Sequence, residues 1–456
     1  MKGLIFTWAL LGVGLLQWSC SGSSEKALAR AEAAYQRKDY NQALALSESA
    51  LQKSPASLQG HRLKALSYLS LGEIEAAFND YDAVAEKHPD IAPLLLKEIS
   101  LGIIQNSMTH ENYFVRSAAV KAIGEMGDAS RLPLLIPFLK DEAPFVRFFT
   151  VESLGQLGGP EALKLLLAAA KDPDGMVRVA AVKALDEMSE AGLPSGPGPG
   201  EVFAFFAGDV EPTVRLFALA ARARRGDDGA FSEMVAITRT LETQARPAAA
   251  AALGRSKNPK GIPLLVRILS EPDPTLRMYA AEAMGEISSP EIYNPLAKAI
   301  LDKDPSVRGA AATSLGKLGD PRAIPLLDRA AHDPDVMVQI SASEGLKRLG
   351  KSEEAVYRAA LTHDDYAVRH FAIGSLRKVG GKEALPFLVE ALRDDAPRVR
   401  IAAVRAIGEI GGEEAISILK ENLKDPDLAV RTYAAGNVGR LLNKAQAKNA
   451  EARRSR

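Results

Sequence analysis

The sequence predicts an all-α protein built from stacked helical hairpins, and three observations predict this class. An arginine column recurs along most of the chain at steps of 30 or 31 residues, with one step of 37. Small residues, mainly alanine and glycine, stand at fixed offsets from that column. Apolar residues follow helical spacing throughout. Because a repeat this short buries its apolar stripe only against its neighbours, we expect a right-handed α/α superhelical solenoid.

Composition limits the chemistry that this chain supports. The 456 residues include 57 basic and 57 acidic side chains, so the formal net charge is zero and no global field attracts nucleic acid. A single cysteine excludes a disulfide framework or a Cys-based zinc site within one chain. We therefore expect no metal, no cofactor, no nucleic acid and no small-molecule substrate.

Residues 1–20 have the layout of an export signal. Lys2 precedes an apolar run from Gly3 to Leu16, which suits a signal peptide and is short for a membrane span. The only cysteine, Cys20, ends this segment and follows the small residue Ser19.

This arrangement resembles a bacterial lipoprotein signal, although Gln17 and Trp18 depart from the family pattern. The resemblance implies lipidation of Cys20 and export to a membrane facing the periplasm or the cell exterior, with the outer membrane slightly favoured. An ordinary cleaved signal and an uncleaved anchor are the alternatives.

Residues 25–90 carry a 34-residue repeat. Three pairs of positions share this spacing: Ala31 with Ala65, Ala43 with Ala77, and Pro55 with Pro89. Alanine allows two helices to cross closely, and proline ends a helix. The pattern resembles two tetratricopeptide repeats. It predicts either a short recognition module or a cap for the larger array.

Residues 91–440 contain eleven units. The anchor column is Arg116, Arg147, Arg178, Arg215, Arg246, Arg277, Arg308, Gln339, Arg369, Arg400 and Arg431. Alanine usually stands three residues after the anchor, glycine eight after it and aspartate six before it. In one unit, Asp304 and Pro305 predict the capped start of the second helix of a hairpin.

This pattern resembles the HEAT-like repeat family, in the short form also seen in phycobilisome lyase subunits. The resemblance implies that the aspartate and arginine columns form a ladder between adjacent turns, and that the second helices line the concave side. A phosphate-binding arginine stripe is the alternative, and the neutral net charge disfavours it.

Three segments depart from the regular array. Residues 191–200 read AGLPSGPGPG and predict a loop without a helix. The unit around Arg246 lacks the Asp-Pro signal and predicts a softer joint. Residues 441–456 form a basic tail, for which a frayed, solvated end is expected.

A partner surface is expected on the concave side. One residue after the anchor, several side chains are apolar, and we predict that these contact a partner: Phe148, Val179, Leu216, Met278, Ile340 and Ile401. The alternative is burial of this column by the neighbouring unit. The column nine residues after the anchor changes from mostly acidic to mostly basic beyond Glu187. Phe114, Phe145 and Met176 concentrate further apolar surface in the first three units.

The sequence shows no catalytic motif. It contains no His-Glu-x-x-His helix and no G-x-S-x-G elbow. His363 and His370, beside Asp364 and Asp365, favour a solvated turn over a metal site. We therefore expect a non-enzymatic scaffold or adaptor that binds proteins or peptides at the bacterial cell envelope. The alternative is a subunit of an enzyme complex, such as a lyase-like HEAT-repeat component.

Overall fold

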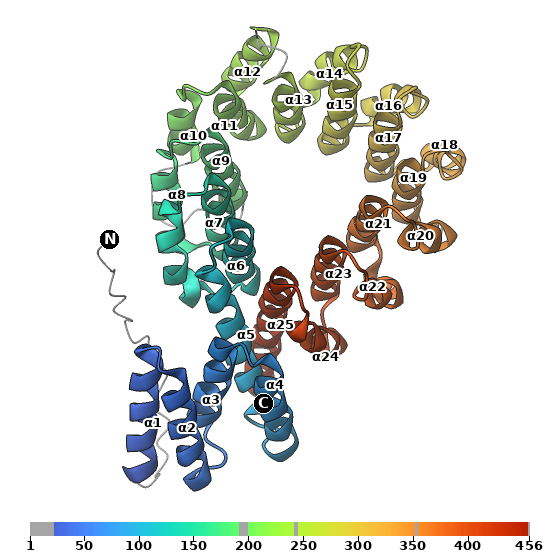
Figure 1. The fold of residues 1–456 in the computed structure, drawn as a ribbon. Helices are drawn as coiled ribbons and strands as arrows, with labels where there is room; N and C mark the ends of the chain where they lie inside the picture. The colour runs from blue at the N-terminus through green and yellow to red at the C-terminus, as the bar shows by residue number, and fades with distance from the viewer. Residues whose placement is uncertain (1–21, 191–198, 241–244, 352–353, 455–456) are drawn as a thin grey trace. The chain divides into compact units, whose positions relative to one another are not determined.

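A computed structural model describes residues 22–190, 199–240, 245–351 and 354–454 (Figure 1). All regular elements within these ranges are helical, which confirms the predicted all-α class. The chain divides into two compact units, Met1–Ile99 and Ser100–Arg456. The division falls inside α5 (Ala92–Met108), later than the expected boundary after residue 90. None of the described helices has the length and apolar character needed to cross a membrane.

Unit 1 contains the two expected helical hairpins. They are α1 (Gly22–Gln36) with α2 (Tyr40–Lys53), and α3 (Leu58–Leu71) with α4 (Ile74–Lys87). The alanines that repeat every 34 residues are fully buried, as their helix-crossing role predicts. The two prolines follow the ends of α2 and α4. The two hairpins are present, and their assignment as tetratricopeptide repeats stays a prediction.

Unit 2, in its described ranges, is an array of eleven inner helices, each beside an outer element (Figure 1). The inner helices are α6 (Tyr113–Met126), α7 (Pro144–Leu157), α9 (Gly175–Glu190), α11 (Pro212–Arg224), α13 (Arg246–Arg255), α15 (Pro274–Ile287), α17 (Pro305–Leu318), α19 (Val336–Arg348), α21 (Tyr366–Val379), α23 (Pro397–Ile410) and α25 (Leu428–Arg454). The outer helices include α8 (Gly159–Ala169), α10 (Pro199–Ala207), α12 (Asp228–Thr240), α14 (Ile262–Ile268), α16 (Tyr293–Ala299), α18 (Ile324–Ala330), α20 (Glu354–Leu361), α22 (Leu385–Ala391) and α24 (Glu413–Glu421). Short 3₁₀ turns replace or extend the outer helices elsewhere, at Ala129–Leu134, Ile136–Lys140, Pro259–Gly261, Pro290–Ile292, Pro321–Ala323, Gly381–Ala384 and Asn422–Lys424.

The inner helices begin where the Asp-Pro signal predicts. The side chain of Asp304 accepts a hydrogen bond from the backbone N–H of Ser306 at 2.9 Å, and Pro305 occupies the first turn of α17. The helix ends at Gly319, whose φ of 73° is left-handed. By contrast, α13 starts without a side-chain cap, as the missing Asp-Pro signal implies.

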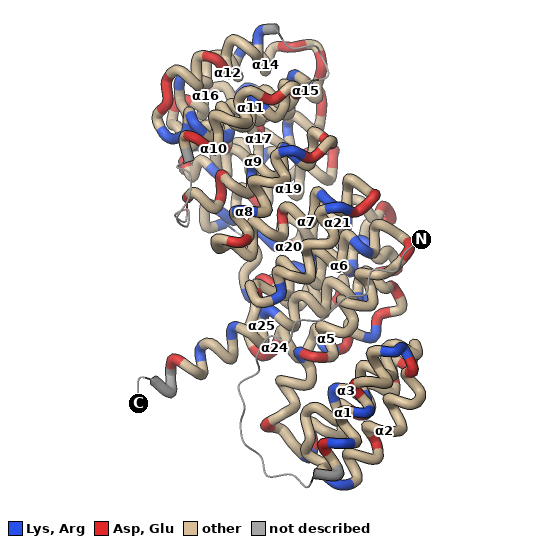
Figure 2. Tube along the Cα trace, turned by 90° about the vertical axis from the view of Figure 1, so that its left-hand side faces the viewer, with Lys and Arg blue, Asp and Glu red and all other residues tan. Residues whose placement is uncertain are grey.

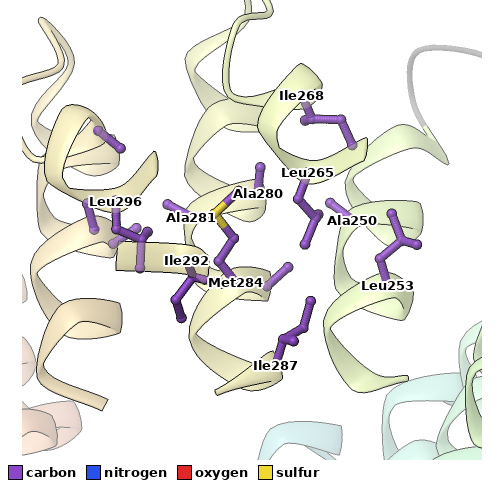
Figure 3. Packing of buried hydrophobic residues seen from close by; sticks show 14 of the residues in the cluster. Ala250, Leu253, Leu265, Ile268, Ala280, Ala281, Met284, Ile287, Ile292 and Leu296 are labelled. Atoms are coloured by element: carbon purple, nitrogen blue, oxygen red, sulfur yellow. The ribbon is translucent and has the colours of Figure 1, made fainter. Parts of the chain in front are cut away.

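The core lies between inner and outer helices and continues from unit to unit. Ala281 and Met284 of α15 are fully buried and belong to one apolar cluster with Leu253 of α13 and Leu265 of α14 (Figure 3). Small residues set the spacing between inner helices: a Cβ added at Gly316 would lie 2.3 Å from the Cα of Gly345. The glycine column therefore marks close crossings of neighbouring helices.

The arginine column forms the expected ladder. In seven steps an arginine donates from Nε and Nη2 to both carboxylate oxygens of an aspartate in the next unit: Arg116 to Asp141, Arg147 to Asp172, Arg178 to Asp209, Arg277 to Asp302, Arg308 to Asp333, Arg369 to Asp394, and Arg400 to Asp425. Nη1 of the same arginines donates to two backbone carbonyls of its own unit; for Arg277 both distances are 2.9 Å. These arginines are occupied within the fold, which argues against a phosphate-binding stripe.

The ladder lacks its acidic partner at three joints. Thr240, His363 and His110 stand where the other units carry Asp or Glu. The two histidines keep only the turn-forming role of aspartate: Nδ1 of His363 accepts the N–H of Asp365 at 3.0 Å, and Nδ1 of His110 accepts that of Asn112 at 3.1 Å. At these joints the inner helices pack on each other, and the described residues form no carboxylate–guanidinium clamp between the units.

Unit 2 closes on itself, a feature that the repeat pattern does not predict. Each inner helix packs on the next, and α25 packs on α6, so the eleven inner helices complete a cycle (Figure 1). Ser107 Oγ and Thr432 Oγ1 lie 2.7 Å apart, and Arg405 Nε donates to Glu125 at 3.0 Å. A Cβ at Gly436 would lie 2.9 Å from the Cα of Ala122. We call this α25–α6 contact the seam.

Two expected boundaries are wrong. Helix α10 begins at Pro199, so the predicted loop 191–200 ends earlier; residues 191–198 lie outside the described ranges. Proline is favoured in the first turn of a helix, which explains this start. The supposed frayed tail is helical to Arg454, because its Ala, Lys, Gln, Glu and Arg residues are strong helix formers. Leu441 and Leu442 in this segment are buried.

We predict that Arg277→Gln destabilises the protein by about 1–3 kcal/mol, because Asp302 loses its guanidinium partner. Arg215→Gln should have a much smaller effect, since among the described residues Arg215 donates to the carbonyls of Asp209 and Val210 and to no carboxylate. Thermal or urea unfolding of both variants measures the difference, and equal losses would contradict a stabilising role for the clamp.

The same pair of variants gives a pH test. Burial alone raises the pKa of Asp302, but hydrogen bonds from Arg277 and from the Asp304 N–H outweigh it, so the pKa lies below its ordinary value. A lowered native pKa stabilises the fold above the unfolded pKa, and this contribution is lost as pH falls through the native pKa. The deficit of Arg277→Gln should therefore shrink below about pH 4. A deficit that is independent of pH would contradict the ionic clamp.

Candidate functional site

Exposed aromatic side chains gather at the start of the first inner helices. Phe114 is 53% exposed, Phe145 43% and Met176 60%, and Tyr113 is also exposed. The ring centroids of Tyr113 and Phe114 are 4.2 Å apart, and those of Phe114 and Phe145 5.7 Å. We call Tyr113, Phe114, Phe145, Phe148 and Phe149 the aromatic cluster.

Local structure fixes the exposed part of this cluster. Asn112 caps α6 by accepting the N–H of Phe114 at 2.9 Å, and Pro144 begins α7. Residues two or three positions before each anchor therefore lie in the first turn of an inner helix, at the rim of the array. In later units the matching positions carry smaller or polar residues such as Thr213, Ser306 and Ala367.

The aromatic cluster continues from the rim onto the inner wall, the name we give to the surface of the inner helices that faces away from the outer elements. The Phe149 ring lies 4.7 Å from that of Phe145 and 5.2 Å from that of Phe148. On its other side, the Lys121 Nζ lies 4.5 Å from the centre of the Phe149 ring. A continuous series of ring contacts thus connects the apolar surface at the rim to the cation Lys121 on the inner wall.

The contact between a cation and an aromatic ring recurs along the inner wall. Lys183 lies 4.5 Å from the ring centre of Phe217, and the Arg405 guanidinium lies 5.7 Å from that of Tyr433. In each case the cation stands five residues after its anchor and the ring two residues after the next anchor. Burial of Tyr433, with the charge of Glu125 nearby, raises the pKa of its hydroxyl to about 12.

Charged residues elsewhere on the inner wall are largely paired between units. Lys317 Nζ lies 2.5 Å from Glu286, and Glu344 accepts from both Arg348 and Lys378. The buried carboxylate of Asp186 accepts from three arginines, namely Arg224, Arg225 and Arg255. Lys and Arg are interspersed with Asp and Glu along unit 2 (Figure 2). Part of the mixed-charge column nine residues after the anchor therefore forms ion pairs that hold neighbouring units together.

Half of the predicted partner-binding residues are unavailable. Val179, Leu216 and Ile340 are buried, with Leu216 and Ile340 at 0% exposure. The prediction is corrected for these three, because buried side chains present no surface to a partner. Phe148, Met278 and Ile401 are half-buried, and their contact with a partner stays a prediction.

The other residues that the sequence singled out have the following places in the molecule. Cys20 lies outside the described residues. His363 lines a polar hollow at the rim together with Asp364 and the clamp residues Arg369 and Asp394. Within the described ranges, no group of three His, Cys, Asp or Glu residues is placed to hold a metal ion.

Sequence reasoning missed the contribution of Tyr113 and Phe149 to the aromatic cluster. Both could have been found from position. Tyr113 directly follows the capping Asn112 and so starts a helix at the rim. Phe149 stands four residues after Phe145 and therefore shares its helix face.

We predict that Ile340→Asp destabilises unit 2 by more than about 3 kcal/mol, because it places a carboxylate in the core. Phe114→Asp, at an exposed position, should leave the melting temperature nearly unchanged. Circular-dichroism melts of the two variants test this difference. A similar loss in both would mean that the aromatic cluster supports the fold and is not free surface.

Comparison with known proteins agrees with the repeat architecture. A model of HEAT repeats matches residues 101–186, 262–347 and 353–438, together more than half of the chain. No curated protein matches the sequence.

Solved structures that are similar include the complex of CpcE and CpcF of phycocyanin lyase from Nostoc, with 21% identity over 54% of this chain and 97% of that chain, at a TM-score of 0.36. Human deoxyhypusine hydroxylase shares 20% identity over 61% of this chain and 91% of its own, at a TM-score of 0.25. An engineered protein shares 19% identity over 75% of this chain and 98% of its own, at a TM-score of 0.26. Identities this low concern the fold alone. On the family match and its repeated helical hairpins, the chain belongs to the HEAT-repeat family.

Proposed function

We propose that this protein is a non-enzymatic scaffold that binds a protein partner through the aromatic cluster, while a lipid on Cys20 holds it at a bacterial membrane. The observation that carries the binding role is the exposure of Tyr113, Phe114 and Phe145. Rings left in water at the rim cost free energy that a partner's apolar side chains would recover.

Two further features support a binding surface at this place. The cap at Asn112 and the proline at the start of α7 fix the rim backbone, so little conformational entropy is lost when a partner binds. The rings also contact one another in stacked and edge-to-face geometry, which orders them before binding.

The membrane tether rests on the sequence of residues 1–20. The apolar run that ends at Cys20 favours export with lipidation, and acyl chains on that cysteine would keep the chain at a membrane surface. The tether and the aromatic cluster are independent parts of the proposal, and each has its own test.

Site-specific photo-crosslinking tests the binding role. A benzoylphenylalanine at position 145 in the native host should give a discrete crosslinked product, whereas the same group at Val266, an exposed residue of the outer helix α14, should not. The partner, identified by mass spectrometry and purified, should lose most of its affinity for Phe114→Asp. No product at position 145, equal products at both positions, or unchanged affinity of Phe114→Asp would contradict the proposal.

Fractionation tests the tether. Cys20→Ser should move the protein from the membrane fraction to the soluble fraction and abolish labelling by an alkyne-tagged fatty acid. Because the chain has no other cysteine, any thioether-linked label reports on this site alone. Membrane association that persists in Cys20→Ser would overturn the lipid tether.

A further inference from the structure

The inner wall around the seam carries an excess of positive charge. Five consecutive inner helices form this region: α21, α23, α25, α6 and α7. Apart from the anchor arginines and the extension of α25 beyond Leu442, their cations are Arg377, Lys378, Arg398, Arg405, Arg440 and Lys121, and their carboxylates are Glu409, Glu125 and Glu152. Lys378 already pairs with Glu344 of α19, so five cations remain against three carboxylates. On the remaining six inner helices, the two signs nearly balance. We call the five-helix surface the seam face.

The carboxylates of the seam face already have partners within the chain. Glu125 accepts from Arg405 at 3.0 Å and from the Asn437 amide at 3.2 Å. Glu409 accepts from Arg377 at 2.7 Å. Glu152 lies 3.8 Å from Lys121, longer than the other two contacts, and burial raises the pKa of Glu152.

Two of the cations, Lys121 and Arg440, lack full compensation. Burial, and then the charge of Arg405, lower the pKa of Lys121, and Arg377 from a third helix adds to the effect. Arg440 donates from Nη2 to Asn437, but its Nε is buried without a hydrogen-bond partner in the described structure. Positive charges from α6, α21 and α23 therefore converge at this place, because the closure of the array brings its first and last units together.

Aromatic surface adjoins these cations. Lys121 lies against Phe149, which contacts Phe145 and so links the seam face to the exposed aromatic cluster. A ligand that neutralises the seam face and also covers the cluster must carry both carboxylates and large apolar side chains. The basic C-terminal extension of the chain has the wrong sign to fill this place.

We infer that the seam face binds an acidic segment of a protein partner, whose carboxylates compensate Lys121 and share Arg377 and Arg405 with Glu409 and Glu125, while its apolar side chains cover the aromatic cluster. This inference rests on the proposed binding function and adds the chemistry of the partner. Complementary charge steers such a segment to the surface and sets its selectivity, and the aromatic rings supply apolar contact.

Fluorescence anisotropy with two labelled peptides tests the inference on the full-length chain. One peptide alternates Glu with Phe and Leu, and the other replaces each Glu by Lys. The acidic peptide should bind, and its affinity should fall as salt rises. Tighter binding of the basic peptide, equal binding of both, or binding of neither would overturn the inference. This comparison needs no variant and does not depend on how substitutions affect folding.

Matched variants locate the site. Lys121→Gln with Arg377→Gln should weaken the acidic peptide by about tenfold, since two charge pairs are lost. The control, Lys317→Gln with Lys347→Gln, removes two cations from α17 and α19, which lie outside the seam face, and should change the affinity little. Equal effects of the two pairs would overturn the assignment, as would complete displacement of the peptide by millimolar inorganic phosphate, which indicates a free-anion site. Crosslinking at position 145 that persists when the acidic peptide fails would leave the proposed function standing and reject only the chemistry of the partner.

Discussion

The contact between α25 and α6 decides the form of unit 2. Helices separated by more than 300 residues approach closely enough that Gly436 has no room for a side chain beside Ala122. A helical repeat array ordinarily needs terminal units with polar outer faces, because its first and last units expose apolar surface to water. Here the two ends cover each other. The core has no exposed end, and the inner wall becomes one continuous surface.

Most charged residues of the ladder and of the inner wall stabilise the fold, and only a few are available to a partner. Most ladder arginines direct their donors to a neighbouring aspartate and to backbone carbonyls, so they order the units and offer little to a ligand. Pairs such as Lys317 with Glu286 do the same on the inner wall. Cations without full compensation lie at the seam face, namely Lys121 and Arg440. Exposed aromatic rings lie at the rim, where Phe114 and Phe145 face water.

The sequence predicted the parts of this molecule that repeat. The hairpins and the helix caps depend on residues close in sequence, so periodic columns were enough to find them, and the resemblance to HEAT-like repeats implied the ladder between adjacent units. It also predicted apolar excess in the first units at Phe114 and Phe145.

Closure was not predicted, because it depends on the total of the small rotations between the eleven units. No single column of residues determines this total rotation. One sign was available: the first and last units keep small residues, Ala122 and Gly436, where a terminal cap would carry polar ones. The burial of Leu216 and Ile340 was missed for a related reason, since the rotation of each inner helix about its axis decides whether the residue after the anchor meets water or its neighbour.

Closure itself is open to a direct measurement. Ser107 Oγ and Thr432 Oγ1 are 2.7 Å apart, so cysteines at these positions, in a Cys20→Ser background, are placed to form a disulfide. We expect rapid intramolecular crosslinking under mild oxidation, detected by a gel shift and by the linked peptide in mass spectrometry, and none for a control pair at Ser107 and Ser341. Cysteines at 107 and 432 that stay as free as the control pair would show that the array is open, and the seam face would then not exist.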